Sequence, residues 1–133
     1  MRTKEALLAG AMIVCAIAFS FAHLHQSANA IYEQARDLTG GGDAESAPAK
    51  IHAYGCDSCH IIPGIAGEQG TVGPRLDQMR TQFTLAGELP NTAENMAGFI
   101  QHPRALVPQT AMPEMGVTEQ DARDITAYLY TIR

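Results

Sequence analysis

Two cysteines and a histidine with a defined spacing stand near the middle of the chain, as Cys56, Cys59 and His60 in a C-x-x-C-H run. Thiols three residues apart lie on one turn of the chain, so they can add to the two vinyl groups along one edge of a porphyrin. The next residue, His60, is then held beneath the iron, where its imidazole is a suitable ligand. The run therefore predicts one haem c, attached covalently through Cys56 and Cys59 and bound at the iron by His60.

Two other uses of a cysteine pair fit the sequence less well. A thioredoxin-like dithiol needs βαβ surroundings, whereas the flanking residues have helical or glycine-rich patterns. A structural zinc site needs four ligands, and the chain has three cysteines and no second C-x-x-C pair. Haem attachment is thus the favoured interpretation.

The second axial position of the iron can take Met or His, or stay open. Met112 lies in a loop bounded by Pro108 and Pro113. A thioether is a weak ligand that packing must hold in place, so a proline-stiffened loop is a suitable mount. We expect Met112 to be the sixth ligand, although methionines also serve simply to fill a core. The other candidates are Met115, which is the nearest rival, and Met79, Met96, His52 and His102.

The N-terminal segment is typical of export or of membrane anchoring. Two basic residues precede an uncharged apolar run, Ala6–Ala22, which as a helix would reach about 26 Å, just short of a bilayer core of about 30 Å. The A-x-A pattern at residues 28–30 resembles a signal-peptidase site. The length of the apolar run, extended to residues 6–24, favours a retained anchor. Residues 1–30 are therefore either a signal peptide or, preferred here, an uncleaved transmembrane anchor, with the rest of the chain on the periplasmic side of a bacterial inner membrane.

Composition and charge restrict the remaining function classes. A chain of 133 residues that is 46% hydrophobic holds one compact domain. Its net charge of −5 argues against nucleic-acid binding, which needs a clustered basic face. After Gly40 there is a single lysine, Lys50, so docking to a partner is expected to use a basic patch on that partner or apolar contact.

Glycines mark the expected domain boundary. The run from Thr39 to Asp43 contains three consecutive glycines, which separates a spacer at 31–42 from a domain at 43–133. Strand patterns are weak, and residues 61–76 form a long loop rich in glycine and proline. The domain is predicted to be all-α, with helices from Pro48 to about Tyr54 or Gly55, from Asn91 or Thr92 to Pro103, and from Thr118 to Ile132.

Taken together, these motifs resemble a class I c-type cytochrome, bacterial and exported, over about residues 40–133. The resemblance rests on the C-x-x-C-H run, on Gly73-Pro74-Arg75-Leu76, on Thr110-Ala111-Met112-Pro113 and on the closing helix at 124–129. It implies a helical class I cytochrome c fold around one covalently bound haem, preceded here by the N-terminal apolar helix. It also implies that the first and last helices of the domain cross.

The resemblance has two further consequences for individual residues. It implies that Pro74 offers its backbone carbonyl to the second nitrogen of His60, which would fix the imidazole and make it more electron-donating. In the family, the first helix usually carries a glycine and an aromatic residue at the crossing. The candidates for that contact in this chain are Ala47, Ile51 and Tyr54.

Haem with His and Met ligands has no open position, which favours one-electron transfer over enzymatic catalysis. The expected partners are redox proteins: a quinol–cytochrome c reductase, a terminal oxidase or a dehydrogenase. A first alternative is a haem-bearing electron-transfer subunit of a larger membrane oxidoreductase complex. A second is an open-site haem protein that binds a gas or reduces peroxide, which requires Met112 to be a core residue. A haem-free thiol oxidoreductase would require Cys56 and Cys59 to be free thiols.

Overall fold

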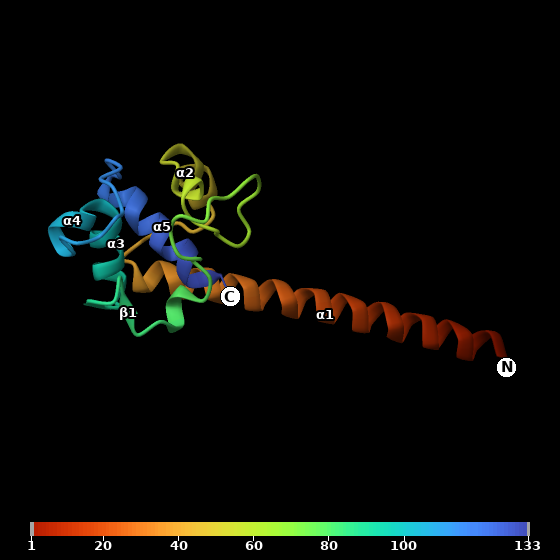
Figure 1. The fold of residues 1–133 in the computed structure, drawn as a ribbon. Coiled ribbons are helices and arrows are strands. Elements are labelled where there is room, and N and C mark those ends of the chain that lie inside the picture. Colours follow the sequence, from red (N-terminus) through yellow and green to blue (C-terminus); the bar gives the residue numbers. More distant parts are fainter. Residues whose placement is uncertain (1, 133) are drawn as a thin grey trace. The chain divides into compact units, whose positions relative to one another are not determined.

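The structure is a computed structural model that describes residues 2–132 of the chain, with the side chains of residue 8 and residues 10–132 (Figure 1). Most of these residues lie in helices, and the strands β1 and β2 among them form one short antiparallel pair. The prediction of an all-α domain preceded by a long apolar helix is confirmed. In chain order the elements are α1 (Arg2–Leu38), α2 (Ala47–Ala53), the 3-10 turns η1 (Cys56–Ser58) and η2 (Met79–Thr81), β1 (Thr84–Leu85), β2 (Leu89–Pro90), α3 (Ala93–Gln101), α4 (Pro103–Leu106) and α5 (Glu119–Thr131).

The chain divides into two compact units, Met1–Ile31 and Tyr32–Arg133. Within the described residues, one helical stretch, Gly10–Leu38, is long and apolar enough to cross a membrane, and no part of its most apolar window is buried. A signal sequence near the N-terminus has the same properties. Anchor and signal peptide therefore stay as the two predictions for residues 1–30.

The second unit begins before the expected domain boundary, because the end of α1 packs into it. Ala35 is 1% exposed and belongs to the hydrophobic core, and Thr39 is also buried. A Cβ on Gly42 would collide with the backbone carbonyl of Arg123 in α5. The absence of a side chain at Gly42 thus lets the chain lie directly on α5 at this point. The division into a spacer at 31–42 and a domain at 43–133 stays a prediction.

Local capping explains where two of the predicted helices begin. The side-chain oxygen of Thr92 accepts a hydrogen bond from the Asn95 N–H at 3.1 Å at the start of α3. Thr118 accepts from the Asp121 N–H at 3.2 Å at the start of α5. Each cap satisfies a backbone donor that the helix itself leaves unpaired. Pro103 ends α3 as predicted, but it also begins the short α4, since proline is tolerated in the first turn of a helix.

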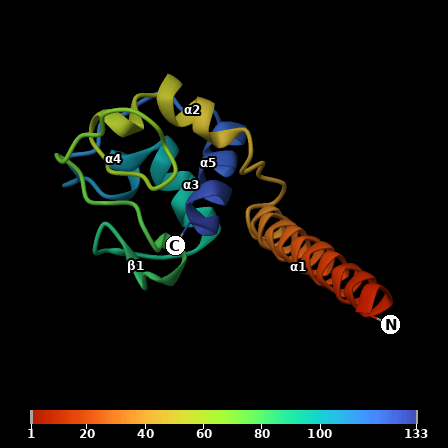
Figure 2. The ribbon, with the colours of Figure 1, turned by 90° about the vertical axis from the view of Figure 1, so that its right-hand side faces the viewer.

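Helix α5 is the centre of the second unit and packs against both α2 and α3 (Figures 1 and 2). Seven consecutive residues of α5, 124–130, are buried. On α2, Ala47 and Ile51 are fully buried, as the resemblance led us to expect for the helix crossing. Burial of apolar side chains between these three helices is the main stabilising contribution that the chain itself provides.

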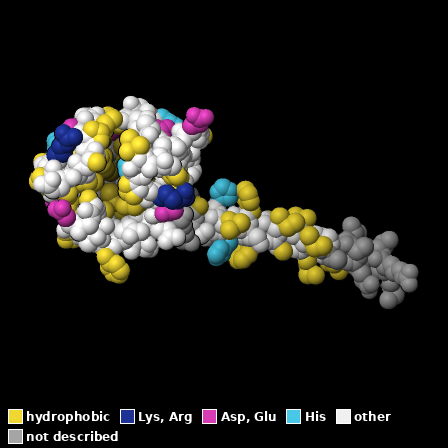
Figure 3. Space-filling model, in the orientation of Figure 1, with side chains coloured by type: hydrophobic (Ala, Val, Ile, Leu, Met, Phe, Trp, Pro, Cys, Tyr) yellow, Lys and Arg dark blue, Asp and Glu magenta, His cyan; other side chains and the backbone are white. Residues whose placement is uncertain are grey.

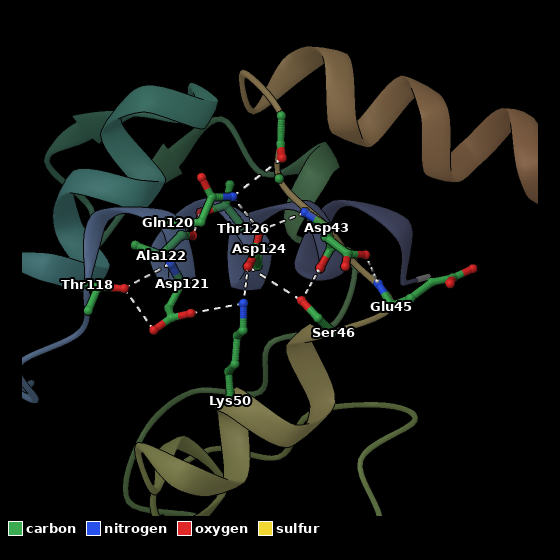
Figure 4. A network of polar contacts seen from close by, with 12 residues as sticks. Asp43, Glu45, Ser46, Lys50, Thr118, Gln120, Asp121, Ala122, Asp124 and Thr126 are labelled. Atoms are coloured by element: carbon green, nitrogen blue, oxygen red, sulfur yellow. Dashed lines mark hydrogen bonds and ion pairs between the residues drawn. The ribbon is translucent and has the colours of Figure 1, made fainter.

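Polar groups also join α2 to α5 at this crossing (Figure 4). Asp124 is 2% exposed, accepts hydrogen bonds from the Asp43 N–H at 2.7 Å and from Gln120 at 2.9 Å, and forms an ion pair with Lys50. Lys50 also pairs with Asp121 at 2.9 Å, and the Tyr54 hydroxyl donates to Asp121 at 2.7 Å. A buried carboxylate is tolerated only when it is paired in this way. Tyr54 therefore contributes to the crossing through its hydroxyl group.

The same contacts shift the ionisation of these groups. Hydrogen bonds from Lys50, Tyr54 and Thr118 lower the pKa of Asp121 from 3.8 to about 2. Burial acts to raise the pKa of Asp124, but bonds from the Asp43 N–H, Lys50 and Gln120 outweigh it and lower the pKa overall. Hydrogen bonds to Asp124 and Asp121 raise the pKa of Lys50 above 10.5.

We expect the free energy of unfolding to fall as the pH is lowered from about 5 toward 2. The pKa of Asp121 is lower in the folded chain than in the unfolded chain, so its ionised form stabilises the fold above its ordinary pKa of 3.8, and this contribution is lost toward about 2. Urea denaturation of the haem-loaded protein at several pH values measures the free energy of unfolding. Asp121→Asn should flatten this part of the profile, and Asp77→Asn, which breaks a surface pair with Arg75, should not. Equal profiles for the wild type and Asp121→Asn would contradict the assignment.

Candidate haem-binding site

The C-x-x-C-H run folds into a single turn directly after α2. Gly55 adopts a left-handed conformation, with φ of 69°, which lets the chain leave α2 and enter η1 at once. The backbone N–H of His60 donates to the carbonyl of Cys56 at 3.0 Å and closes the turn. The structure thus brings Cys56, Cys59 and His60 together on one turn of backbone, the arrangement that the spacing predicts.

A second stretch of chain runs beside this turn and supports it. The N–H groups of Gly70 and Gly73 donate to the carbonyls of Asp57 and Cys59, both at 2.8 Å. A Cβ on Gly70 would overlap the carbonyl of Ser58, so only glycine permits this approach. The attachment turn is therefore braced by backbone contacts from the glycine-rich loop.

The His60 ring is oriented by the residues of the Gly73–Pro74 motif. Its Nδ1–H donates to the Pro74 carbonyl at 2.7 Å. Among the described residues no hydrogen bond uses Nε2, so that nitrogen is free to bind a metal. A Cβ on Gly73 would lie 2.6 Å from Nδ1, well inside van der Waals contact. Hydrogen bonding and close packing together fix the ring.

The two site cysteines are half-buried and form no disulfide. Burial is the main cause that raises the pKa of the Cys56 thiol, and the negative charge of Asp57 raises it further. Redox-active dithiols depend on a lowered thiol pKa. Cys56 has the opposite property, which argues against a thiol oxidoreductase.

Gln69 and Tyr128 hold the loop after His60, and the sequence analysis did not identify either of them. The Gln69 side chain accepts from the Ile62 N–H at 2.6 Å and donates to the carbonyls of Ile62 and Ile65 at 3.1 and 2.6 Å. The Tyr128 hydroxyl, from α5, donates to the Pro63 carbonyl at 2.7 Å. The Ile62 and Ile65 side chains are buried in the core beneath this loop.

The expected sixth ligand, Met112, lies on the loop between α4 and α5. Its side chain is half-buried, and its backbone N–H donates to the Thr110 hydroxyl at 3.2 Å, which helps to shape the loop. The other candidate ligands lie in different surroundings. Of the methionines, Met96 is buried in the core, Met79 packs against that core, and Met115 is exposed. Of the histidines, His52 pairs with Asp57, and Nδ1 of His102 lies 3.9 Å from Oε2 of Glu114.

The family model described as Cytochrome c matches residues 46–133. The chain belongs to the cytochrome c family. The match covers α2 to α5 and includes all of the site residues predicted from the sequence. No curated protein matches the chain. Membership means that the cytochrome carries covalently attached haem c and acts in haem-based electron transfer with other redox proteins.

The side chains of this cytochrome fit that cofactor. Two free thiols and an imidazole with an unbonded Nε2 lie on one turn, and glycine at position 73 leaves the ring just enough space. Figure 3 shows a hollow in one face of the second unit, lined by hydrophobic side chains. Thiols for covalent attachment, a nitrogen ligand and apolar surroundings are the features that haem c requires.

Gly73→Ala should destabilise the haem-loaded cytochrome by about 1–3 kcal/mol, the usual cost of overpacking a filled site. The new methyl group would press against the His60 ring. The backbone is held in place here because the Gly73 N–H donates a hydrogen bond to the Cys59 carbonyl. Urea denaturation measures the loss. Gly98→Ala in α3 is the control, since its Cβ would meet only the end of the Leu106 side chain and alanine favours a helix. Equal stability of Gly73→Ala and the wild type would show that the His60 ring leaves room for a side chain at position 73.

Proposed function

We propose that this cytochrome is a one-electron carrier whose iron is ligated by His60 and Met112. The observation that carries the proposal is the bond between His60 Nδ1 and the Pro74 carbonyl, which leaves Nε2 as the ligating nitrogen beside the two thiols. Met112, a half-buried methionine on a proline-bounded loop, is the thioether best suited to be the second ligand. With both axial positions filled, no site is left for a substrate.

Each residue has a defined part in this function. Haem supplies the reversible one-electron Fe(III)/Fe(II) change. Cys56 and Cys59 would hold it at the attachment turn, and the Pro74 carbonyl would keep the Nδ1 proton on His60 and make the imidazole a stronger donor. Met112 and the apolar lining favour the less charged ferrous state, so the reduction potential should be positive.

The partners that we propose are redox proteins of a respiratory or similar chain, such as a quinol–cytochrome c reductase, a terminal oxidase or a dehydrogenase. Lys50, the single lysine after Gly40, is engaged with two carboxylates, so it is not free to steer the protein toward an acidic surface. Val72, beside the Gly73–Pro74 motif, is 87% exposed and offers an apolar contact point. Docking through a basic or apolar patch on the partner therefore suits this surface.

We propose that the cytochrome works on the periplasmic side of a bacterial inner membrane, held there by residues 6–24 unless the segment is cleaved as a signal peptide. The apolar side chains of α1 are exposed in the N-terminal unit, including Phe19, Phe21 and Leu24. Such a surface suits lipid or another transmembrane helix. It also supports the second candidate, a haem-bearing subunit of a larger membrane oxidoreductase complex.

A potentiometric titration of the purified, haem-loaded protein, followed by absorbance, tests the proposed function. We expect one reversible one-electron transition with a positive midpoint potential and no consumption of added hydrogen peroxide. Catalytic turnover of peroxide would contradict the carrier function and favour the open-site alternative.

A further inference from the structure

The side chain of Gln69 is fully engaged with the backbone of the loop between His60 and Pro74. Its Oε1 accepts from the Ile62 N–H at 2.6 Å, and its Nε2 donates to the carbonyls of Ile62 and Ile65 at 3.1 and 2.6 Å. An amide side chain has two N–H donors, and here both are used. The Ile62 and Ile65 side chains are buried in the core. Gln69 therefore ties the return half of the loop to its buried first half.

One of these bonds fixes a peptide group that also holds Leu76. The Ile62 N–H and the Ile61 carbonyl belong to the same peptide unit, which is planar and trans, so they point in opposite directions. On one side the N–H donates to Oε1 of Gln69. On the other side the carbonyl accepts from the Leu76 N–H at 2.9 Å. The orientation of this carbonyl, and with it the position of Leu76, therefore depends on Gln69.

Leu76 is in turn one of two points that hold the Pro74 carbonyl against the His60 ring. The other is Gly73, whose N–H donates to a carbonyl of the attachment turn at 2.8 Å. These two backbone bonds bracket Pro74, whose carbonyl accepts from His60 Nδ1–H at 2.7 Å. Gly73 is secured directly to the attachment turn, whereas Leu76 is secured through the peptide group that Gln69 orients. A series of hydrogen bonds and short backbone links thus leads from Gln69 to the imidazole.

We propose that Gln69 is a positioning residue for the ligand His60: it holds the Pro74 carbonyl in line with Nδ1–H and so sets how strongly the imidazole donates to the iron. The inference rests on the proposed function, in that His60 is an axial ligand. A firmly held carbonyl strengthens its bond to Nδ1–H and makes Nε2 a better donor. A better donor favours the ferric state, so Gln69 lowers the reduction potential.

The test is hydrogen exchange of the His60 Nδ1–H in the reduced, haem-loaded protein, followed by NMR in the wild type and in Gln69→Met. Methionine fills a similar volume but cannot form the three bonds that the amide forms. We expect exchange in Gln69→Met to be about tenfold faster, the usual net effect of losing a hydrogen bond, and the reduction potential to be higher. An exchange rate or a potential equal to that of the wild type would overturn the proposal.

The amides of α5 separate positioning from a general loss of stability. The N–H groups of its buried residues 124–130 should open only when the whole fold unfolds. We expect Gln69→Met to speed exchange at His60 relative to these amides, whereas an equal increase at both would show a purely structural role and overturn the proposal. Gln101→Met is the matched control, because the Gln101 side chain donates to the Ala97 carbonyl within α3, and it should leave exchange at His60 unchanged.

A second measurement uses the wild type alone, so it tests the proposal even if Gln69→Met does not fold. The N–H groups of Ile62 and Leu76 and the Nδ1–H of His60 should share one free energy of opening, smaller than that of α5, because their bonds belong to one series. If the His60 proton opens separately from the other two, Gln69 does not hold the ring, and the proposal is wrong.

Failure of this inference is distinguishable from failure of the proposed function. A wrong ligation would appear as binding of carbon monoxide to the reduced wild-type protein. A wrong positioning role would leave that spectrum intact and abolish only the difference in His60 exchange between the wild type and Gln69→Met.

Discussion

Replacing Met112 with alanine will open the iron and lower the reduction potential by on the order of 100 mV, a fraction of the roughly 0.8 V that axial ligands span. The thioether favours the ferrous state, and its loss leaves water or an empty position that favours the ferric state. The Met–iron charge-transfer band of the oxidised protein should disappear, and the reduced variant should bind carbon monoxide. Potentiometry and absorption spectra measure all three effects.

The control for this prediction is Met115→Ala. Met115 lies on the same loop three residues later and is exposed, so its removal should leave the band and the potential unchanged. If Met115→Ala loses the band while Met112→Ala keeps it, the two methionines have been assigned the wrong way round. If neither variant loses it, the ligand comes from another part of the chain.

The double variant Cys56→Ala/Cys59→Ala, made without haem, should show no cooperative thermal unfolding of the second unit. The chain contains no Trp and only 6% aromatic residues, so haem is the largest apolar body available to its core. A small domain that loses such a group loses much of the buried surface that offsets conformational entropy. The binding energy that haem contributes to the folded state disappears with it.

Circular dichroism at increasing temperature measures this loss, with Cys15→Ala as the matched control. Cys15 lies in the N-terminal helix and outside the attachment turn, so the haem-loaded Cys15→Ala protein should unfold cooperatively, as the wild type does. A cooperative transition in the haem-free double variant would show that the side chains of α2, α3 and α5 suffice for a stable fold.

Features set by neighbouring residues could be predicted from the sequence. The caps at Thr92 and Thr118, the break at Pro103 and the single turn of residues 56–60 depend on contacts within a few positions, and they occur in the structure as expected. The family resemblance added the contact between His60 and Pro74, a bond that the structure contains. Its role in ligation stays a prediction.

Features that depend on distant parts of the chain could not be predicted. The burial of Ala35 in the hydrophobic core and the bond from Tyr128 to Pro63 exist only once the chain has folded. Asp124 had no distinguishing signal, since an aspartate in a helix is usually solvated. Its burial follows from Lys50 and the Asp43 N–H, which arrive from 74 and 81 residues away.

The central claim is that the cytochrome holds a closed haem with His60 and Met112 as axial ligands. The most direct measurement is the absorption spectrum of the protein made in a host competent for c-type haem attachment, recorded oxidised, reduced, and reduced with carbon monoxide. We predict a c-type reduced spectrum that carbon monoxide does not alter, and a Met–iron charge-transfer band in the oxidised protein. A reduced spectrum that shifts with carbon monoxide would contradict the claim and make gas binding or peroxide reduction the better account.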